Sequence, residues 1–149
     1  MRVLIQRVKH ASCTVEGKIT GKIEQGFLMF VGCCDSDDDS VIAKMATKAS
    51  CLRIFEDEQG KMNKSLEDVG GSILSISQFT LYADCRKGRR PSFIDAAKGE
   101  KAIVMYDKFN NDLRKLGFHV EEGIFGADMK IELLNDGPVT IWLDSETIV

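Results

Sequence analysis

The order of strand-like and helix-like segments constrains the fold of this chain most. About eight short runs are apolar or alternate in the manner of strands, whereas two segments repeat apolar residues at helical spacing. The strands do not alternate regularly with helices, so a doubly wound parallel sheet is not expected. The pattern predicts an α+β fold with a mostly antiparallel, curved or barrel-like sheet and two main helices.

The strand predictions depend on local patterns of apolar residues and turn residues. Glu16-Gly17 is expected to form the turn of a hairpin, and the apolar run that follows it is typical of a strand buried on both faces. Strands are predicted at residues 3–8, 13–23 (the hairpin), 26–33, 52–56, 72–82, 118–123, 129–134 and 139–144.

The helix predictions depend on caps and on apolar stripes. Ser36 is expected to cap the first helix, and the acids at 37–39 suit the positive end of the helix dipole. A metal site is the alternative for these acids, but no further ligands follow at loop spacing. The second helix is predicted from about Asp95 to Leu116, with Gly117 ending it.

Size and charge favour one domain, residues 1–149, with a substantial core, since 44% of its 149 residues are hydrophobic. The net charge of −3 argues against general coating of nucleic acid but leaves room for a local basic site. The first ten residues are too polar for a signal peptide, and no stretch approaches the ~20 apolar residues of a membrane span. We therefore expect a cytoplasmic protein without membrane contact.

The five cysteines form no CxxC motif and no cluster with histidine. In a cytoplasmic protein they are expected to be reduced thiols. The adjacent pair Cys33-Cys34 is interpreted as buried, because a free cysteine behaves as a small hydrophobic residue. A redox or metal protein built on this pair is the alternative.

A polar cluster, "SQFTLY", stands where the strand at 72–82 approaches its end. Strict alternation would place Gln78 and Thr80 on one face, and Ser77 with Phe79 on the other. Residues at strand ends and in the following loops are common catalytic positions, although a pair of polar residues on a solvated face is the simpler interpretation. Neither His10 nor His119 lies in a nucleophile-elbow context, so a serine–histidine triad is not supported.

The segment "RKGRRPSF" is the one concentrated basic patch of an acidic chain. Its cations, Arg86, Lys87, Arg89 and Arg90, could hold phosphates by charge and by bidentate arginine contacts. A solvated loop is the alternative. Its position directly after the polar strand end favours a substrate that carries phosphate.

A proline follows glycine in "NDGPVT", next to the most apolar strand of the C-terminal part of the sequence. Proline cannot donate to a sheet ladder, so it is expected at an edge, a strand start or a bulge. An X–Pro bond can be cis at modest cost. From local pattern alone, Gly137-Pro138 is interpreted as a tight turn between two strands.

The combination of "SQFTLY", "GRRPSF" and "FGADMKIELLNDGPVTIWL" resembles the D-aminoacyl-tRNA deacylase family over essentially the whole chain. The resemblance implies a homodimer that hydrolyses the ester between a D-amino acid and the terminal adenosine of tRNA, and glycine mis-attached to the alanine tRNA. It implies no metal and no cofactor.

The resemblance also assigns roles to residues. It places Ser77, Gln78, Phe79 and Thr80 in the catalytic pocket, and the loop 86–90 against the tRNA acceptor end. Gly137-Pro138 corresponds to a Gly-cisPro motif that enters the pocket of the partner subunit and excludes L-amino acids. Arg7 matches a position that fixes this motif, and Met129 matches one in the same pocket.

Physical chemistry supplies reasons for these roles. Enantiomers share their hydrophobicity, so rejecting one of them needs a fixed steric element near Cα. Backbone N–H groups around Phe79 and Thr80 are candidate oxyanion donors, with water assisted by the 2′-hydroxyl as the attacking group. Thr80 as nucleophile is the weaker alternative, because no base is evident. A non-catalytic tRNA- or RNA-binding module is the alternative function.

Overall fold

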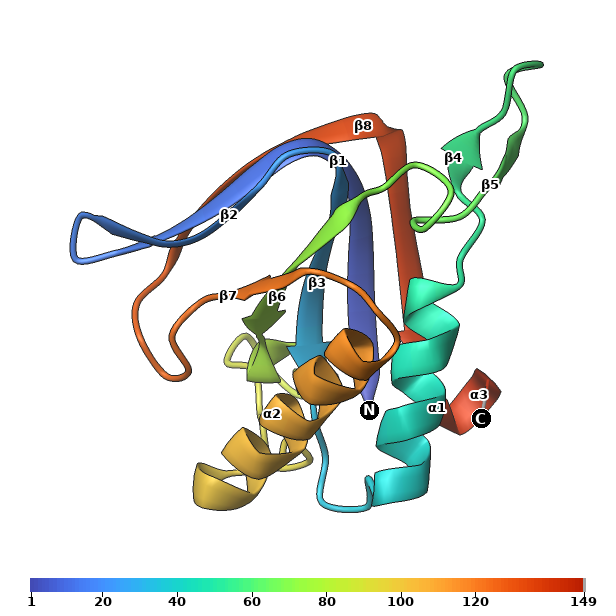
Figure 1. Ribbon diagram of the computed structural model, residues 1–149. Helices are drawn as coiled ribbons and strands as arrows, with labels where there is room; N and C mark the ends of the chain where they lie inside the picture. The colour runs from blue at the N-terminus through green and yellow to red at the C-terminus, as the bar shows by residue number, and fades with distance from the viewer. Residues whose placement is uncertain (149) are drawn as a thin grey trace.

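A six-stranded curved sheet forms the centre of the computed structural model, which describes residues 1–148 (Figure 1). The strand order is β2-β1-β3-β6-β7, and β8 pairs with the other side of β1. The strands of this sheet are β1 (Arg2–Val15), β2 (Lys18–Ile23), β3 (Gly26–Gly32), β6 (Ser72–Ser77), β7 (Val120–Glu122) and β8 (Lys130–Asp144).

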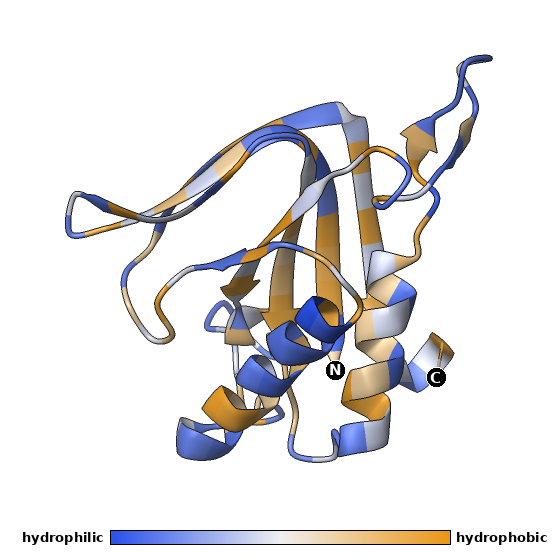
Figure 2. Cartoon of the chain, viewed as in Figure 1, coloured by the Kyte–Doolittle hydropathy of each residue, from blue (hydrophilic) through white to orange (hydrophobic). Residues whose placement is uncertain are grey.

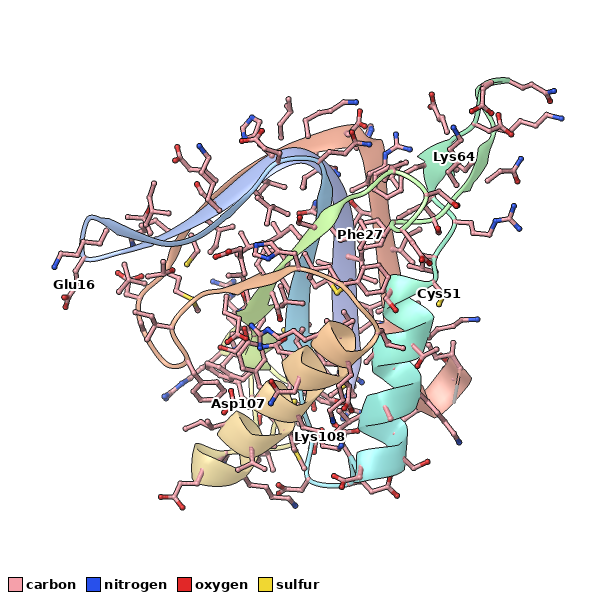
Figure 3. All side chains as sticks on the ribbon, in the orientation of Figure 1. Glu16, Phe27, Cys51, Lys64, Asp107 and Lys108 are labelled. Carbon is pink, nitrogen blue, oxygen red and sulfur yellow. The ribbon has the colours of Figure 1, made fainter. Side chains whose placement is uncertain are left out.

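Strand β1 is the centre of the sheet, because it pairs antiparallel with β2, β3 and β8. Its first half lies between β3 and β8, and its second half lies between β2 and β8. The predicted hairpin is confirmed: Glu16 and Gly17 both have positive φ, at 49° and 78°, as a type I′ turn requires. Figure 3 shows Glu16 at the far tip of this hairpin.

The sheet is mixed rather than purely antiparallel, which corrects part of the fold prediction. Strands β3 and β6 are parallel, and so are β6 and β7. Parallel neighbours need crossover connections, and here these contain the helices α1 (Asp39–Ser50) and α2 (Gly99–Lys115). The predicted curvature is confirmed, because β2 curls round to β7: a methyl group on Gly21 would lie 2.7 Å from the carbonyl oxygen of Glu122.

The two long helices cover one face of the sheet with their apolar stripes. In α1 the predicted stripe is buried at Ile42, Met45, Ala46 and Ala49. Figure 2 shows largely hydrophobic central strands behind α2, whose residues are mostly hydrophilic, whereas α1 is mixed. Phe27, at the centre of Figure 3, is fully buried and stacks on Phe55 at 5.3 Å between ring centroids.

A second, smaller apolar cluster lies on the other face, inside the curl of the sheet. It is built from strand residues only and is completed by partly buried side chains from the start of β8 and the residue before it. Its buried members are Val8, Ala11, Cys13, Ile23, Leu28, Leu74 and Ile76.

The cap of α1 is Asp38, not Ser36 as predicted. The Asp38 carboxylate accepts a 2.8 Å hydrogen bond from the Val41 N–H. Asp37 faces inward instead, accepting from the Cys34 N–H at 2.8 Å and pairing with the α-amino group of Met1. The acids therefore serve structure, and within residues 1–148 no group of three metal-ligating side chains occurs.

Asp38→Ala is expected to destabilise the protein by about 1 kcal/mol, because one N–H of the first helical turn loses its acceptor. Ser36→Ala should change the free energy of unfolding by less than about 0.5 kcal/mol, since its hydroxyl does not cap the helix. Urea unfolding of both variants checks this, and equal losses would contradict the assignment of the cap.

Several predicted boundaries are wrong. The strand predicted at 52–56 is reduced to β4 (Phe55–Glu56), which pairs with β5 (Met62–Lys64) in a projecting hairpin near the labelled Lys64 (Figure 3). The strand predicted at 72–82 ends at Ser77, and a 3₁₀ helix, η1 (Phe79–Tyr82), follows.

Helix α2 begins at Gly99 rather than near Asp95, because the residues before it are bound elsewhere. The Ala97 N–H donates to the Cys33 carbonyl at 2.8 Å, and Ala96 forms a bridge with Cys34. Cys33 and Cys34 are buried, as expected for structural thiols. Within residues 1–148, no helix combines the length and apolar character needed to cross a bilayer.

Strand β8 runs through the glycine–proline pair without a turn, which corrects the prediction of two separate strands. Gln6 pairs with Thr140 and Val8 pairs with Asn135, so residues 136–139 of β8 bulge opposite the single residue Arg7. Proline is tolerated in a bulge, where its missing N–H breaks no ladder bond. The Gly137-Pro138 peptide bond is cis, and both residues are exposed. After β8 the chain ends in a short helix, α3 (Ser145–Ile148).

Candidate active site

A cavity of about 280 Å³ opens where β3 and β6 end side by side. Because these strands are parallel, their carboxyl ends meet at the same edge of the sheet. Helix α2 and the segment 125–131 provide the other walls. The cavity is therefore enclosed by elements that are distant in the sequence.

The polar strand end lies at this cavity. Ser77, Gln78 and Phe79 line it, and so does Met129 from the segment 125–131. The chain leaves the sheet at Gln78, whose φ of −146° and ψ of 81° lead into η1. Gln78 and Thr80 were predicted to share a strand face, and the 3₁₀ turn still brings them together: Gln78 Nε2 donates to Thr80 Oγ1 at 2.6 Å.

Two backbone N–H groups are free at the start of η1. Within residues 1–148, neither Phe79 nor Thr80 has an acceptor for its N–H; the first bond of the helix runs from Leu81 N–H to the Gln78 carbonyl at 3.3 Å. Free N–H groups at the start of a helix are suited to an anionic oxygen. The side chain of Phe79 is 56% exposed and meets Phe93 edge-on, with 5.0 Å between ring centroids.

The titratable groups inside the cavity are held in their neutral forms. Burial raises the pKa of the Cys33 thiol to about 12, and burial likewise raises the pKa of Tyr106 to about 12. The Tyr106 hydroxyl donates to the Ser75 carbonyl at 2.8 Å. Neither group can accept a proton as a general base at neutral pH.

Neither the histidines nor the one carboxylate at the cavity provides a general base inside it. Within the described residues no histidine lines the cavity: His10 is exposed on β1, and His119 pairs with Glu121 at 2.8 Å. Asp128 lies at the cavity edge and pairs with Lys130 at 3.0 Å in solvent. The site therefore offers hydrogen-bond donors and shape rather than a base.

Arg7 holds the bulge that carries Gly137-Pro138. Arg7 is only 5% exposed, and its Nη1 donates to the Ile54 carbonyl at 2.6 Å. Its Nε donates to the Asp136 carbonyl at 3.2 Å and lies 3.4 Å from the Asp136 carboxylate. The bulge is thus tied to two segments of the chain by one buried guanidinium group.

The structure does not bring this bulge to the cavity of the same chain. Arg7 pairs with Phe27 near the start of β3, whereas the cavity begins at Val31, which pairs with Val3. Those two positions on β3 are separated by roughly 13 Å along the strand. Of the predicted pocket residues, Ser77, Gln78, Phe79 and Met129 lie together and Thr80 joins them through Gln78, while Arg7, Gly137 and Pro138 lie apart.

The basic loop follows η1 and is closed by a bridge between Asp84 and Ser92. Arg86 is engaged inside the loop, where its Nε and Nη2 each contact the Asp84 carboxylate at 2.8 Å. These bonds hold the pKa of Asp84 at about 2. Lys87, Arg89 and Arg90 are exposed and have no ion pair within residues 1–148.

The sequence did not predict that α2 and the buried thiol of Cys33 line the cavity. Ala102 and Tyr106 belong to the apolar stripe of α2, and such a stripe is normally interpreted as core. Phe125 and Gly126 also line the cavity; they begin the segment "FGADMKIELLNDGPVTIWL" that carried the resemblance, but no role was assigned to them.

The chain matches the family model described as D-Tyr-tRNA(Tyr) deacylase over residues 4–144. The chain belongs to this family. Membership in the D-Tyr-tRNA(Tyr) deacylase family makes the chain an enzyme of the deacylase class, and it confirms the resemblance seen in the sequence.

Known members of the deacylase family are similar over nearly their whole length. A D-aminoacyl-tRNA deacylase of Thermomicrobium roseum is 59% identical over 97% of this chain and 94% of its own length. One of Thermus aquaticus is 54% identical over 97% of this chain and 95% of its own. A solved structure titled c-Myc DNA Unwinding Element Binding Protein superposes with a TM-score of 0.91 and 39% identity, covering 97% of this chain and 98% of that one.

Proposed function

We propose that this chain hydrolyses the ester that joins a D-amino acid to the 3′-terminal adenosine of tRNA. The observation that carries the proposal is the cavity at the ends of β3 and β6, where Ser77, Gln78 and Phe79 meet two free backbone N–H groups. Membership of the deacylase family supports it. The protein acts in the cytoplasm, where tRNA is charged.

In the proposed reaction, the N–H groups of Phe79 and Thr80 bind the oxyanion that develops at the ester carbonyl. Each such donor is typically worth about 3 kcal/mol of transition-state stabilisation. Water attacks the carbonyl carbon, assisted by the 2′-hydroxyl of the adenosine, and the 3′-oxygen of the ribose leaves. The protein's contribution is to orient the ester and to stabilise the charge.

Thr80 is not proposed as the nucleophile. Its hydroxyl already accepts a 2.6 Å hydrogen bond from Gln78, and the titratable groups of the cavity interior, Cys33 and Tyr106, stay protonated at neutral pH. A hydroxyl nucleophile needs a base within hydrogen-bond reach to activate it. We assign the Gln78–Thr80 pair to positioning of the first turn of η1.

Chiral selection is assigned to Gly137-Pro138 of a second subunit. The bulge is exposed and lies away from the cavity of its own chain, so it can reach a cavity only in another copy. Backbone held by the buried Arg7 is a fixed obstacle near the Cα of the substrate. It would collide with an L side chain and accept the hydrogen of a D residue. Glycine has no side chain to reject, so glycine on the alanine tRNA is proposed as a second substrate.

A homodimer is part of this proposal, and β8 offers the surface for it. Trp142 is 47% exposed and Leu134 is 52% exposed on this strand. Trp142 pairs with Leu4 of β1 on the face turned away from the main core. Large apolar side chains exposed on a sheet face are typical of a surface that a partner covers.

The deciding experiment offers D-tyrosyl-tRNA and L-tyrosyl-tRNA to the purified protein and measures release of tyrosine. Rapid cleavage of the D-ester with protection of the L-ester is expected. Equal rates for both, or release of neither, would refute the proposal. Tight tRNA binding without any deacylation would instead support the RNA-binding module.

The exposed cations of the loop are proposed to bind the phosphates of the acceptor end. Arg89→Ala with Arg90→Ala is expected to raise KM for D-tyrosyl-tRNA by about 10-fold and to reduce the salt dependence of binding, because two phosphate contacts are lost. The matched control neutralises the exposed Lys44 and Lys48 of α1. An unchanged KM in the loop variant, or an equal rise in the control, would argue against this assignment.

A further inference from the structure

Gly123 directly follows β7 and precedes the segment 125–131 that lines the cavity. Its N–H donates to the Ser75 carbonyl at 3.3 Å, which accepts the Tyr106 hydroxyl as well. A methyl group on Gly123 would overlap the sulfur of Met129 and would lie 3.1 Å from Ile76 Cδ1 and 3.2 Å from Cys13 Sγ. The Met129 side chain therefore occupies the space that any larger residue at position 123 would need.

The backbone at Gly123 does not itself require glycine. Gly123 is absent from the glycines with positive φ, so an alanine there fits the backbone conformation. The requirement comes only from packing, and the atom in the way is the far end of a flexible side chain. Ile76 and Cys13 are buried within the smaller apolar cluster and cannot yield.

Met129 separates position 123 from the cavity. A methyl group on Gly123 would press on the Met129 sulfur, and Met129 lines the cavity at the ends of β3 and β6 whereas Gly123 does not. A group added at position 123 would push the thioether into that cavity. Methionine has three rotatable side-chain bonds, so this movement is more readily achieved than a shift of the sheet.

We propose that Gly123 is a positioning residue that sets how far Met129 extends into the substrate cavity. The proposal rests on the proposed function, since it takes this cavity as the site of the aminoacyl ester. It adds a residue that touches no substrate and acts through Met129 alone. The cavity holds about 280 Å³, so a displaced thioether removes a useful part of its volume.

The effect should appear in substrate binding more than in chemistry. The groups at Ser77 to Thr80 are not among the atoms that a methyl group on Gly123 would meet, so we expect them to keep their positions. Gly123→Ala is expected to raise KM for D-tyrosyl-tRNA by about 10-fold, with kcat within about 3-fold of the wild type. A general loss of folded structure would not produce that split.

Four proteins test the inference: wild type, Gly123→Ala, Met129→Ala and the double variant. Met129→Ala has an effect of its own, which the experiment measures. In the double variant the new methyl group occupies the space vacated by the thioether, so its KM is expected to match that of Met129→Ala. Thermal unfolding of the same four proteins should show coupling, with part of any destabilisation by Gly123→Ala relieved in the double variant, since the contacts with Ile76 and Cys13 remain.

The outcomes separate this inference from the proposed function. A wild type that does not cleave the D-ester overturns the proposed function. Two results overturn the inference alone, provided that the wild type is active. One is a KM of Gly123→Ala equal to that of the wild type. The other is a double variant in which Gly123→Ala raises KM as much as it does in the wild type. If Gly123→Ala does not fold, the double variant decides: a KM well above that of Met129→Ala contradicts the proposal, and an equal KM supports it.

Discussion

Phe79→Pro is expected to slow the cleavage of D-tyrosyl-tRNA by at least about 100-fold relative to Phe79→Ala. Both variants lose the aromatic ring and its contact with Phe93, but only proline also removes the backbone N–H. Phe79 is the first residue of η1, and proline is tolerated at the first position of a helix. The ratio of the two rates therefore isolates one proposed oxyanion donor.

Single-turnover rates with saturating enzyme measure this effect without interference from tRNA binding. Thermal unfolding of both variants serves as the control for structure. Equal rates for the proline and alanine variants would show that the Phe79 N–H takes no part, and the oxyanion would have to be stabilised by other groups.

Trp142→Glu is expected to convert a dimer into monomers and to remove most of the protection of the L-ester. An interface that buries Trp142 would have to bury a carboxylate instead, and an unpaired buried charge is strongly unfavourable. The dissociation constant should rise by at least about 100-fold, which corresponds to about 2.8 kcal/mol. L-tyrosyl-tRNA should then be cleaved, because each cavity would lose the partner's Gly137-Pro138.

The matched control is Val104→Glu on α2, where a side chain of 66% exposure receives the same charge. Both variants are measured by sedimentation velocity at micromolar concentration and by cleavage of the D-ester and the L-ester. A Trp142→Glu protein that stays dimeric would place the interface elsewhere. A monomer with full activity and full protection of the L-ester would show that one chain suffices, and the proposal for Gly137-Pro138 would fail.

The sequence predicted elements whose signals are local. The hairpin at Glu16-Gly17 and the buried strand after it follow from turn residues and apolar runs, and both were found. The stripe of α1 was also correct, although its cap moved from Ser36 to Asp38. A helix start with several acids offers more than one capping residue, and the burial of Asp37 decided which one was free to act.

The elements that sequence missed depend on contacts between distant segments. In "SQFTLY" the alternation continues to Tyr82, yet the strand ends at Ser77 because η1 packs over Gly32. A methyl group on Gly32 would lie 3.0 Å from the Gln78 carbonyl oxygen and 3.3 Å from Leu81 Cβ. Nothing near residue 78 in the sequence signals a glycine on the neighbouring strand.

Some residues of the candidate site were also named from the sequence, and others were missed. Ser77, Gln78, Phe79 and Met129 were named from the sequence and line one cavity. The polar strand end singled out Ser77 and Gln78, whereas Phe79 and Met129 were assigned through resemblance to a family. Cys33 and Tyr106 were missed, since a buried thiol and a stripe residue look like ordinary core. The separation of Arg7 and Gly137-Pro138 from the cavity follows from strand register, which no local pattern encodes.

The central position of β1 has a consequence for how the molecule folds. Its partner β8 lies far along the chain: Arg2 and Asp144, which pair across these strands, are 142 residues apart. Pairings of such long range make folding slow, because the entropy of closing the loop is lost before the contact stabilises anything. During synthesis β1 and the β1–β2 hairpin must wait, with one edge unpaired, until β8 has left the ribosome. The clamp between Arg7 and Asp136 is therefore among the last features of the molecule to form.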